Sequence, residues 1–301
     1  MHASIPTSAN QNREASLIIR GIQPEDAEAC GRIAFEAHQV VASAHNFPSE
    51  HPSVEFSIGL MKAKIADRNA YGAVAERDGR IVGSIFLNTF PPAPLAAIGP
   101  LTVDPKVAGG VGKLLMETAL EESRRRGHER VRLVQSPSHL RSLALYTKLG
   151  FAVREPLVLM QCAPSQAPQT EGLVVRPAME EDLPSCNKLC LQKHGFSRKF
   201  ELRSAIEQHT AVLMERTGKI VGYAAGIGFR GHAVAETVED LKAAICASPK
   251  LPGPGFFVPT RQTELLHWLF ESGGKALWPA TLMTLGPYQE PDGVFLPSIA
   301  F

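Results

Sequence analysis

The sequence has no long hydrophobic run. None of its apolar stretches approaches the roughly 20 residues that a helix needs to cross a bilayer. The first residues, MHASIPTSANQNREAS, also lack the apolar centre of a signal peptide. We therefore expect no membrane partner and a cytoplasmic location, and we interpret residues 1–15 as a disordered leader.

An excess of charge of one sign is missing too. The chain has 31 Lys and Arg against 30 Asp and Glu, a formal net charge of +1. Its one basic run, Arg124 to Arg126, falls at the end of a predicted helix, where cations interact favourably with the helix dipole. Nucleic acid is therefore not an expected partner.

Cysteine is scarce and irregularly placed. The five cysteines form an odd, scattered set with no pair at the spacing of a zinc site: Cys30, Cys162, Cys186, Cys190 and Cys246. This pattern predicts reduced, buried thiols in a cytosolic protein, with neither a disulfide framework nor a bound metal.

The chain contains an internal repeat. The segment LIIRGIQPEDAEAC at 17–30 returns as LVVRPAMEEDLPSC at 173–186, and ERDGRIVG at 76–83 returns as ERTGKIVG at 215–222. Two separated blocks in the same order indicate a duplicated domain. The Pro/Ser/Gln-rich stretch 162–172 has the composition of a linker. We therefore predict domains at 16–161 and 173–301.

Within the first copy, the patterns predict the order β-α-α-β-β-β-α-β-α-β. Antiparallel strands come first and a crossover helix comes later. We therefore expect an α/β fold with a mixed sheet and helices on both faces.

A glycine loop lies at residues 104–112. A predicted strand ends at Val103, three glycines follow at 109, 110 and 112, and a helix begins. Glycines allow close approach of a ligand to backbone N–H groups, and a helix N-terminus favours an anion. The loop predicts a site for a phosphate or diphosphate, to which Lys113 adds a charge; a plain tight connection is the alternative.

A second segment strengthens the first interpretation. Residues 145–151, Leu-Tyr-Thr-Lys-Leu-Gly-Phe, end a short amphipathic helix at Gly150. Together with Val103-Asp104-Pro105 and Gly110-Val111-Gly112, this segment resembles the GCN5-related N-acetyltransferase (GNAT) superfamily. The chain is similar to a tandem member with two acyl-CoA N-acyltransferase-like domains. It departs from the family pattern at Val107, where Gln or Arg is usual, and its loop is one residue shorter.

The resemblance implies an acetyl-CoA-dependent N-acetyltransferase. It implies coenzyme contacts along the fourth strand, the glycine loop and the start of the last helix of the first domain: Leu101, Thr102, Val103, Ala108, Gly109, Gly110, Val111, Gly112, Lys113 and His139. For His139 a helix cap is the other role. The resemblance also places Tyr146 as the general acid that protonates the leaving thiolate, against a purely structural or coenzyme-packing role.

The acceptor and the general base are less clearly marked. The segment between the first two helices offers His45, Glu50, His51 and Glu55, and the second domain offers Tyr288 and Glu290. The expected acceptor is a primary amine of a small molecule or amino acid derivative. A protein lysine or N-terminus, or a non-catalytic acyl-CoA-binding module, are the alternatives. A monomer and a homodimer are equally compatible with the sequence.

The second copy has lost the glycine loop. Its equivalent, residues 232–245, has no glycine, and Glu236, Glu239 and Asp240 would repel a phosphate. The G-x-G-x-x-G pattern at 226–231 is not followed by a helix, so it predicts a turn. We expect a degenerate domain that helps to wall the acceptor site, with Trp268 in the place of Tyr146.

Overall fold

The computed structural model describes residues 17–91, 94–107, 109–164, 170–248, 251 and 253–299. The predicted leader 1–15 lies outside this part, as does the centre of the predicted linker. The predicted domain boundaries therefore stay predictions, and the two parts of the chain are called here the N-terminal and C-terminal halves.

The N-terminal half begins with a strand and a helical pair and continues as a strand meander. Its elements are β1 (Leu17–Gly21), α1 (Ala27–His45), α2 (Val54–Ala66), β2 (Ala70–Arg77), β3 (Arg80–Thr89), β4 (Leu95–Val103), α3 (Val111–Arg125), β5 (Arg130–Gln135), α4 (Leu140–Lys148) and β6 (Ala152–Gln161). The order agrees with the prediction. Helix α1 continues to His45 because no helix breaker occurs before Asn46, which caps it with φ 54°.

The C-terminal half repeats this order in shorter form. Its elements are β7 (Leu173–Pro177), α5 (Leu183–His194), α6 (Lys199–Glu207), β8 (Val212–Arg216), β9 (Lys219–Ala224), β10 (Ala233–Ala235), α7 (Val238–Ala247), β11 (Phe256–Pro259), α8 (Thr263–Glu271), β12 (Lys275–Leu285) and β13 (Val294–Leu296). The G-x-G-x-x-G pattern forms the turn between β9 and β10, as predicted.

The duplication is visible in an ion-pair network as well as in the order of elements. Arg20 bonds Asp26 at 2.7 Å and Glu76 at 2.9 Å. In the second copy, Arg176 bonds Asp182 at 2.7 Å and Glu215 at 3.3 Å. Each aspartate also accepts a bond from a backbone N–H just before its helix. The repeated sequence blocks therefore conserve one structural joint that ties strand, helix and hairpin together.

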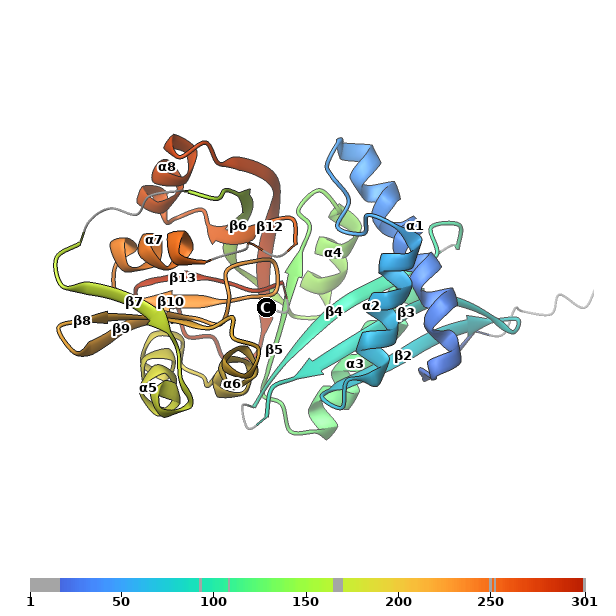
Figure 1. Cartoon of the computed structure of the whole chain (residues 1–301). Coiled ribbons are helices and arrows are strands. Elements are labelled where there is room, and N and C mark those ends of the chain that lie inside the picture. The colour runs from blue at the N-terminus through green and yellow to red at the C-terminus, as the bar shows by residue number, and fades with distance from the viewer. Residues whose placement is uncertain are drawn as a thin grey trace, which may run out of the picture.

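The two halves share one sheet, which the sequence does not predict. Its strand order is β1-β2-β3-β4-β5-β12-β6-β11, so β12 of the C-terminal half lies between β5 and β6 (Figure 1). Conversely, β6 of the N-terminal half lies between β12 and β11. In each half, the strand that follows the last helix therefore pairs with strands of the other half. The hydrophobic cores include the exchanged strands. Met283 of β12 packs in the N-terminal core, and Met160 of β6 packs in the C-terminal core.

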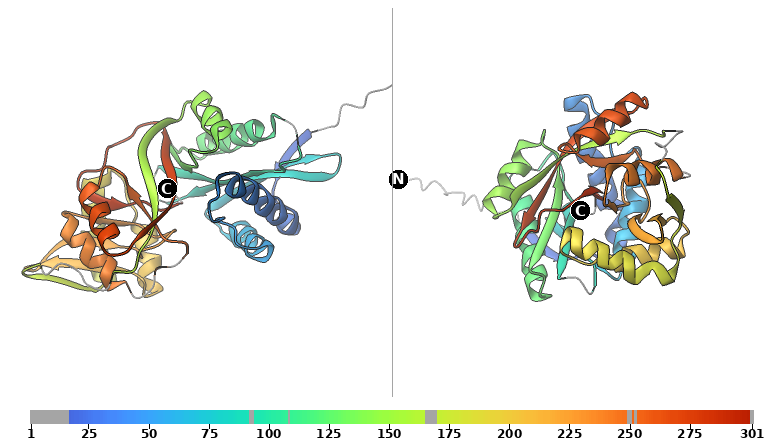
Figure 2. Two further views of the ribbon diagram at one scale, coloured as in Figure 1. Left: turned by 90° about the horizontal axis from the view of Figure 1, so that it is seen from above. Right: turned by 90° about the vertical axis from the view of Figure 1, so that its left-hand side faces the viewer.

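Helices cover both faces of the sheet in the N-terminal half. Figure 2 (left) shows α1 and α2 on one face and α3 and α4 on the other. The described cysteines are free, and all but the half-buried Cys246 are buried. Among the described residues, no helix is both long and apolar enough to cross a membrane.

Candidate functional site

A fork between two parallel strands forms the centre of the candidate site. Strand β4 pairs with β5 only from Leu95 to Ala97, whereas it pairs with β3 as far as Val103. Beyond Ala97 the two strands separate (Figure 1). Backbone groups of Leu101 to Val103 that face β5 therefore have no strand partner there, and an extended ligand can pair with them.

A bulge in β4 lies where the fork opens. The register against β3 shifts between Ile98 and Leu101, which leaves Gly99 and Pro100 without a paired residue. The buried Asn88 amide donates to the carbonyl oxygens of Ala97 at 3.1 Å and Gly99 at 2.9 Å. These two bonds hold the bulge in place, because the Asn88 side chain bonds the backbone on both sides of the residue where the bulge begins.

The glycine loop leads from the open end of the fork to α3. Gly110 caps the helix with φ 93°, a conformation that favours glycine, and the first turn contains no acidic residue. Among the described residues, the amides of Val111 and Gly112 have no backbone partner. Lys113 is exposed, 3.6 Å from Glu117. This end of α3 fits a diphosphate group, because free N–H groups and the helix dipole favour an anion.

Val107 explains how the loop holds its shape without the usual Gln or Arg. Its side chain packs against the N-terminal core, and its N–H donates to the Asp104 carbonyl at 2.9 Å. Asp104 also accepts a bond from the Lys106 N–H at 2.9 Å. The loop is anchored by an apolar contact and a turn, so it offers an anion main-chain groups in place of a Gln or Arg side chain. Ala108 lies outside the described residues.

Tyr146 lies on α4, on the side of the sheet that carries α3. Its ring packs against the N-terminal core, as do Leu101 and Val103, with its centroid 6.1 Å from that of Phe151. Burial raises the pKa of Tyr146 to about 12. The phenol is therefore protonated at neutral pH, as a proton donor must be.

His139 precedes α4 but does not cap it with its side chain. His139 is nevertheless the N-cap residue of α4, as the cap alternative expects, because its carbonyl accepts from the N–H groups of Ser142 at 3.0 Å and Leu143 at 3.3 Å. Burial lowers the pKa of this imidazole, and the charges of Arg141, His38 and His45 lower it further. The ring thus lies near two histidines of the α1 region.

On the opposite side, α1, α2 and the segment between them bring together a cluster of polar groups. The rings of His38 and His51 stack with centroids 3.9 Å apart. His51 Nδ1 lies 2.9 Å from Ser57 Oγ, which itself donates to the Ser53 carbonyl, so Nδ1–H donates and Nε2 is left as an acceptor. Burial, with the charges of His38 and Arg230, lowers the pKa of His51 to about 3.

Glu50 and Lys64 complete this acceptor cluster, defined here as His38, Glu50, His51 and Lys64. Burial raises the pKa of the Glu50 carboxyl, and the nearby His38 opposes part of that rise. The Lys64 ammonium donates to Asn88 Oδ1 and so contacts the residue that fixes the β4 bulge. Burial, then the charge of Arg230, lowers the pKa of Lys64 to about 8. The cluster therefore contains a carboxylate that accepts protons more readily than an exposed one.

The other predicted acceptor residues are not brought to this cluster. His45 is exposed and its Nδ1 bonds the Val41 carbonyl at 2.9 Å within its own helix. Glu55 is exposed on the first turn of α2, where its own backbone N–H and the Ser53 hydroxyl lower its pKa. Tyr288 lies against Arg132, at the paired end of the fork, and Glu290 is exposed.

Sequence reasoning missed His38, Lys64 and Asn88 as site residues. His38 had a signal, because it is matched by His194 in the repeat. Lys64 and Asn88 had none, because a lysine on a helix and an asparagine in a strand carry no motif; their bond to each other appears only in three dimensions.

In the C-terminal half, the counterpart of the glycine loop is closed by its own side chains. Thr237 caps α7 by accepting from the Asp240 N–H at 3.3 Å, and the buried Asp240 accepts from the Thr237 N–H at 3.1 Å. Asp240 also pairs with Arg216 at 2.6 Å. The helix start is thus capped and acidic, which leaves no site for a phosphate.

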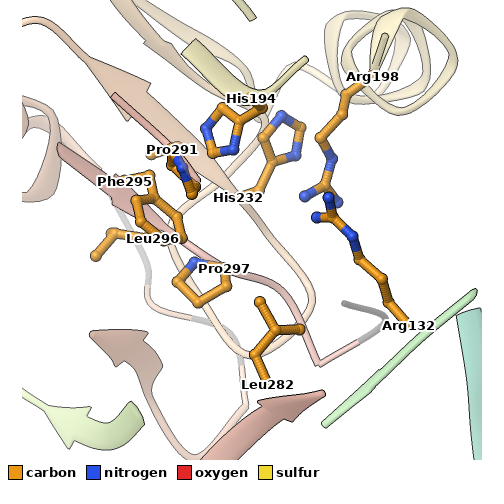
Figure 3. A pocket seen from close by; sticks show the side chains of 10 residues that line it. Arg132, His194, Arg198, His232, Leu282, Pro291, Phe295, Leu296 and Pro297 are labelled. Carbon is orange, nitrogen blue, oxygen red and sulfur yellow. The ribbon is translucent and has the colours of Figure 1, made fainter. Parts of the chain in front are cut away.

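The counterpart of the fork is filled as well. Strand β13 pairs with β10 from Ala233 to Ala235 and contacts β11 on its other side. Beside it a cavity of about 10 Å³ persists, close to the size of one water molecule. Its lining includes His194, the counterpart of His38, together with Arg132, Arg198, His232 and residues around β13 (Figure 3). Aligned on Gly150 and Gly273, the place of Tyr146 is taken by Leu269, so the prediction for Trp268 is wrong by one position.

Comparison with known proteins finds a family match within the N-terminal half. Residues 37–151 match the model of the acetyltransferase (GNAT) family. This part of the chain belongs to the GNAT family. Acetyl-CoA is the acetyl donor of this family, and the chain is an N-acetyltransferase of the acyltransferase class.

The fold of the whole chain is that of a tandem GNAT protein. A proposed acetyltransferase from Pyrococcus horikoshii superimposes over 98% of this chain and 97% of its own length, with a TM-score of 0.66 and 19% identity. A GNAT protein from Sphaerobacter thermophilus covers 92% and 98%, with a TM-score of 0.59 and 15% identity. A tandem GNAT protein from the clavulanic acid pathway covers 91% and 100%, with a TM-score of 0.53 and 15% identity. No curated protein matches the sequence.

Two substitutions in the glycine loop distinguish the effect of an added charge from the effect of an added side chain. Gly109 is exposed, and an added Cβ would meet no atom within 4 Å. We expect Gly109→Asp to weaken coenzyme A binding by about tenfold or more relative to Gly109→Asn, because only the former adds a charge that repels the diphosphate. Isothermal titration calorimetry measures the difference; equal affinities of the two variants would contradict a diphosphate at this loop.

Binding stoichiometry tests the closure of the second copy. Because Asp240 and Thr237 cap α7 and β13 fills the second fork, we expect one coenzyme A per chain. Calorimetry on the wild-type chain measures this ratio, and Gly109→Asp should weaken that one site. Two equivalent sites, or a site unaffected by the substitution, would show that the C-terminal half binds the coenzyme.

Proposed function

We propose that the chain transfers the acetyl group of acetyl-CoA to a primary amine of a small molecule or amino acid derivative. The observation that carries the proposal is the β4/β5 fork, which leads to the acceptor cluster from the amides of Val111 and Gly112, for which the described residues offer no backbone partner. Acetyl-CoA supplies an activated thioester. The fork gives its pantetheine arm the edge of β4 to pair with.

The chain's own groups support direct attack by the amine. Glu50 is proposed as the general base, through a water molecule or directly, because burial raises its pKa toward that of a useful proton acceptor. His51 is a weaker choice, because a pKa of about 3 leaves it little affinity for a proton. The attack forms the C–N bond, the C–S bond breaks, and the phenol of Tyr146 gives its proton to the departing thiolate.

A small acceptor is favoured because the C-terminal half covers the acceptor side. Phe229, from the turn between β9 and β10, packs in one apolar cluster with Phe47 from the segment between α1 and α2. Phe196 packs against Leu95 and Ala97 at the paired end of the fork. These contacts narrow the approach for a folded protein or a long peptide.

Release of the coenzyme A thiol, measured over a panel of small amines, tests the proposal. Amine-dependent release that yields the N-acetyl product in mass spectrometry is the expected result. A chain that binds coenzyme A but acetylates no amine in the panel would instead favour a non-catalytic binding module.

A further inference from the structure

The cavity beside β13 lies at the junction of the two halves (Figure 3). Arg132 in its wall comes from β5 of the N-terminal half, where it pairs with Ala97 at the last position before β4 and β5 separate. The other described lining residues belong to the C-terminal half, and they include His194 at the end of α5 and Arg198 just before α6. A group bound in this cavity would therefore contact both halves at the base of the fork.

His194 has a buried nitrogen that faces this question directly, because none of the described residues bonds its Nε2. The residue is 6% exposed, and the rings of Phe295 and Phe196 meet its ring edge-on, with centroids 5.1 and 5.9 Å away. Burial, with the charges of Arg198 and Arg132, lowers the pKa of the imidazole to about 3, so the ring is neutral. Buried polar atoms of this kind are normally bonded by a ligand or an ordered water.

Two guanidinium groups from different halves reach the same cavity. The ends of Arg132 and Arg198 point toward one another (Figure 3), and both residues are only 3% exposed. Arg198 donates from Nε to Glu201 at 2.7 Å, and the Arg132 guanidinium lies 4.4 Å from the centre of the Phe196 ring. These contacts hold both groups in place. Two like charges in one buried region attract a counter-ion.

The hydrogen-bonding groups and the size of the cavity select the kind of ligand. Guanidinium groups only donate, no acidic residue occurs in the described lining, and the lining side chains that can accept are the neutral imidazoles of His194 and His232. A water molecule must donate as well as accept, whereas an anion only accepts. The volume of about 10 Å³ holds one particle of about the size of water. That size excludes phosphate, sulfate and carboxylates and leaves a halide ion.

We propose that this cavity binds a single halide ion, chloride in ordinary solutions, which joins the two halves at the base of the fork. The ion accepts from the imidazole N–H of His194 and from the guanidinium groups of Arg132 and Arg198. The second copy then holds an ion at the histidine that matches His38 in the repeat, although it has lost the coenzyme loop. The halide site is separate from the acceptor cluster, so it does not depend on the proposed acceptor.

Thermal unfolding of the full chain tests this inference. Sodium chloride replaces sodium gluconate, whose anion is too large for the cavity, from zero to about 0.2 M at constant ionic strength. We expect a saturable rise of the unfolding midpoint by about 2–5 °C, because an ion that binds only the folded chain stabilises it. Bromide should act in the same way. Crystals grown in bromide should show an anomalous difference peak within hydrogen-bond distance of His194 Nε2.

Three variants distinguish this site from general effects of salt. His194→Leu and Arg132→Met each remove a donor and keep a side chain of similar size, so both should lose most of the chloride-dependent rise. Arg203→Gln, which removes an exposed arginine paired with Glu180, should keep it. Equal midpoints in chloride and gluconate for the wild-type chain, or a chloride response that survives both cavity variants, would overturn the inference. Should the cavity variants fail to fold, the wild-type crystals decide, since a cavity without a bromide peak overturns it as well.

Discussion

Replacement of Tyr146 by phenylalanine should lower kcat by about 100-fold or more while leaving coenzyme A affinity nearly unchanged. Tyr146 is the proposed proton donor to the departing thiolate, and its phenol stays protonated because burial raises its pKa to about 12. Phenylalanine keeps the ring contact with Phe151 and the packing against the N-terminal core, so folding should be unaffected.

The pH dependence gives an independent check. A group acting as an acid works only while protonated, and a phenol with a pKa of about 12 stays protonated between about pH 6 and 10. We therefore expect no alkaline decline of kcat in that window for the wild-type chain. The matched control is Tyr71→Phe, which removes the hydroxyl of a half-buried tyrosine in the same half. Turnover of Tyr146→Phe equal to that of the control would end the assignment.

Local patterns predicted most of the secondary structure and the place of the glycine loop before α3, whose role in coenzyme binding stays a prediction. The Asp78-Gly79 turn, with φ of 51° and 76°, and the Thr217-Gly218 turn, with 48° and 79°, are readable because only a few residue types adopt positive φ. The glycine loop is readable for the same reason. The loop offers backbone N–H groups to a ligand, and glycines in the sequence mark where such groups have no side chain beside them.

The acceptor side could not be predicted because it depends on contacts between distant segments. Lys64 and Asn88 come from α2 and β3, and neither carries a local signature. The strand exchange could not be predicted from the sequence for a related reason. β12 and β6 have the composition of ordinary buried strands, and alternation alone does not say which neighbour each one pairs with.

The exchange makes a strong prediction about the isolated N-terminal half. A chain that ends at residue 164 loses β12, which pairs with β5 from Gln135 to Val131 and with β6 from Gln161 to Ala152. Two strand edges and the apolar surface around them would then be exposed to solvent, and such edges promote aggregation. We expect this truncated chain to be insoluble or unfolded and to bind no coenzyme A, as measured by circular dichroism and calorimetry. A folded, active fragment would show that β12 is dispensable.

A single substitution tests the same claim in the full chain. Met283 of β12 is fully buried in the N-terminal core, so Met283→Ala should cost about 2–5 kcal/mol of unfolding free energy. Met179→Ala, at a methionine that is 51% exposed, is the control and should cost little. Trp268 packs against the C-terminal core and Trp278 lies on β12 against β6, so tryptophan fluorescence reports the C-terminal half and its junction with the N-terminal half. Loss of coenzyme A binding reports the N-terminal half. Because each half packs a strand of its partner into its core, the two signals should be lost in one transition, shifted together by Met283→Ala. Separate transitions, with only the coenzyme signal shifted, would mean that the halves fold independently despite the shared sheet.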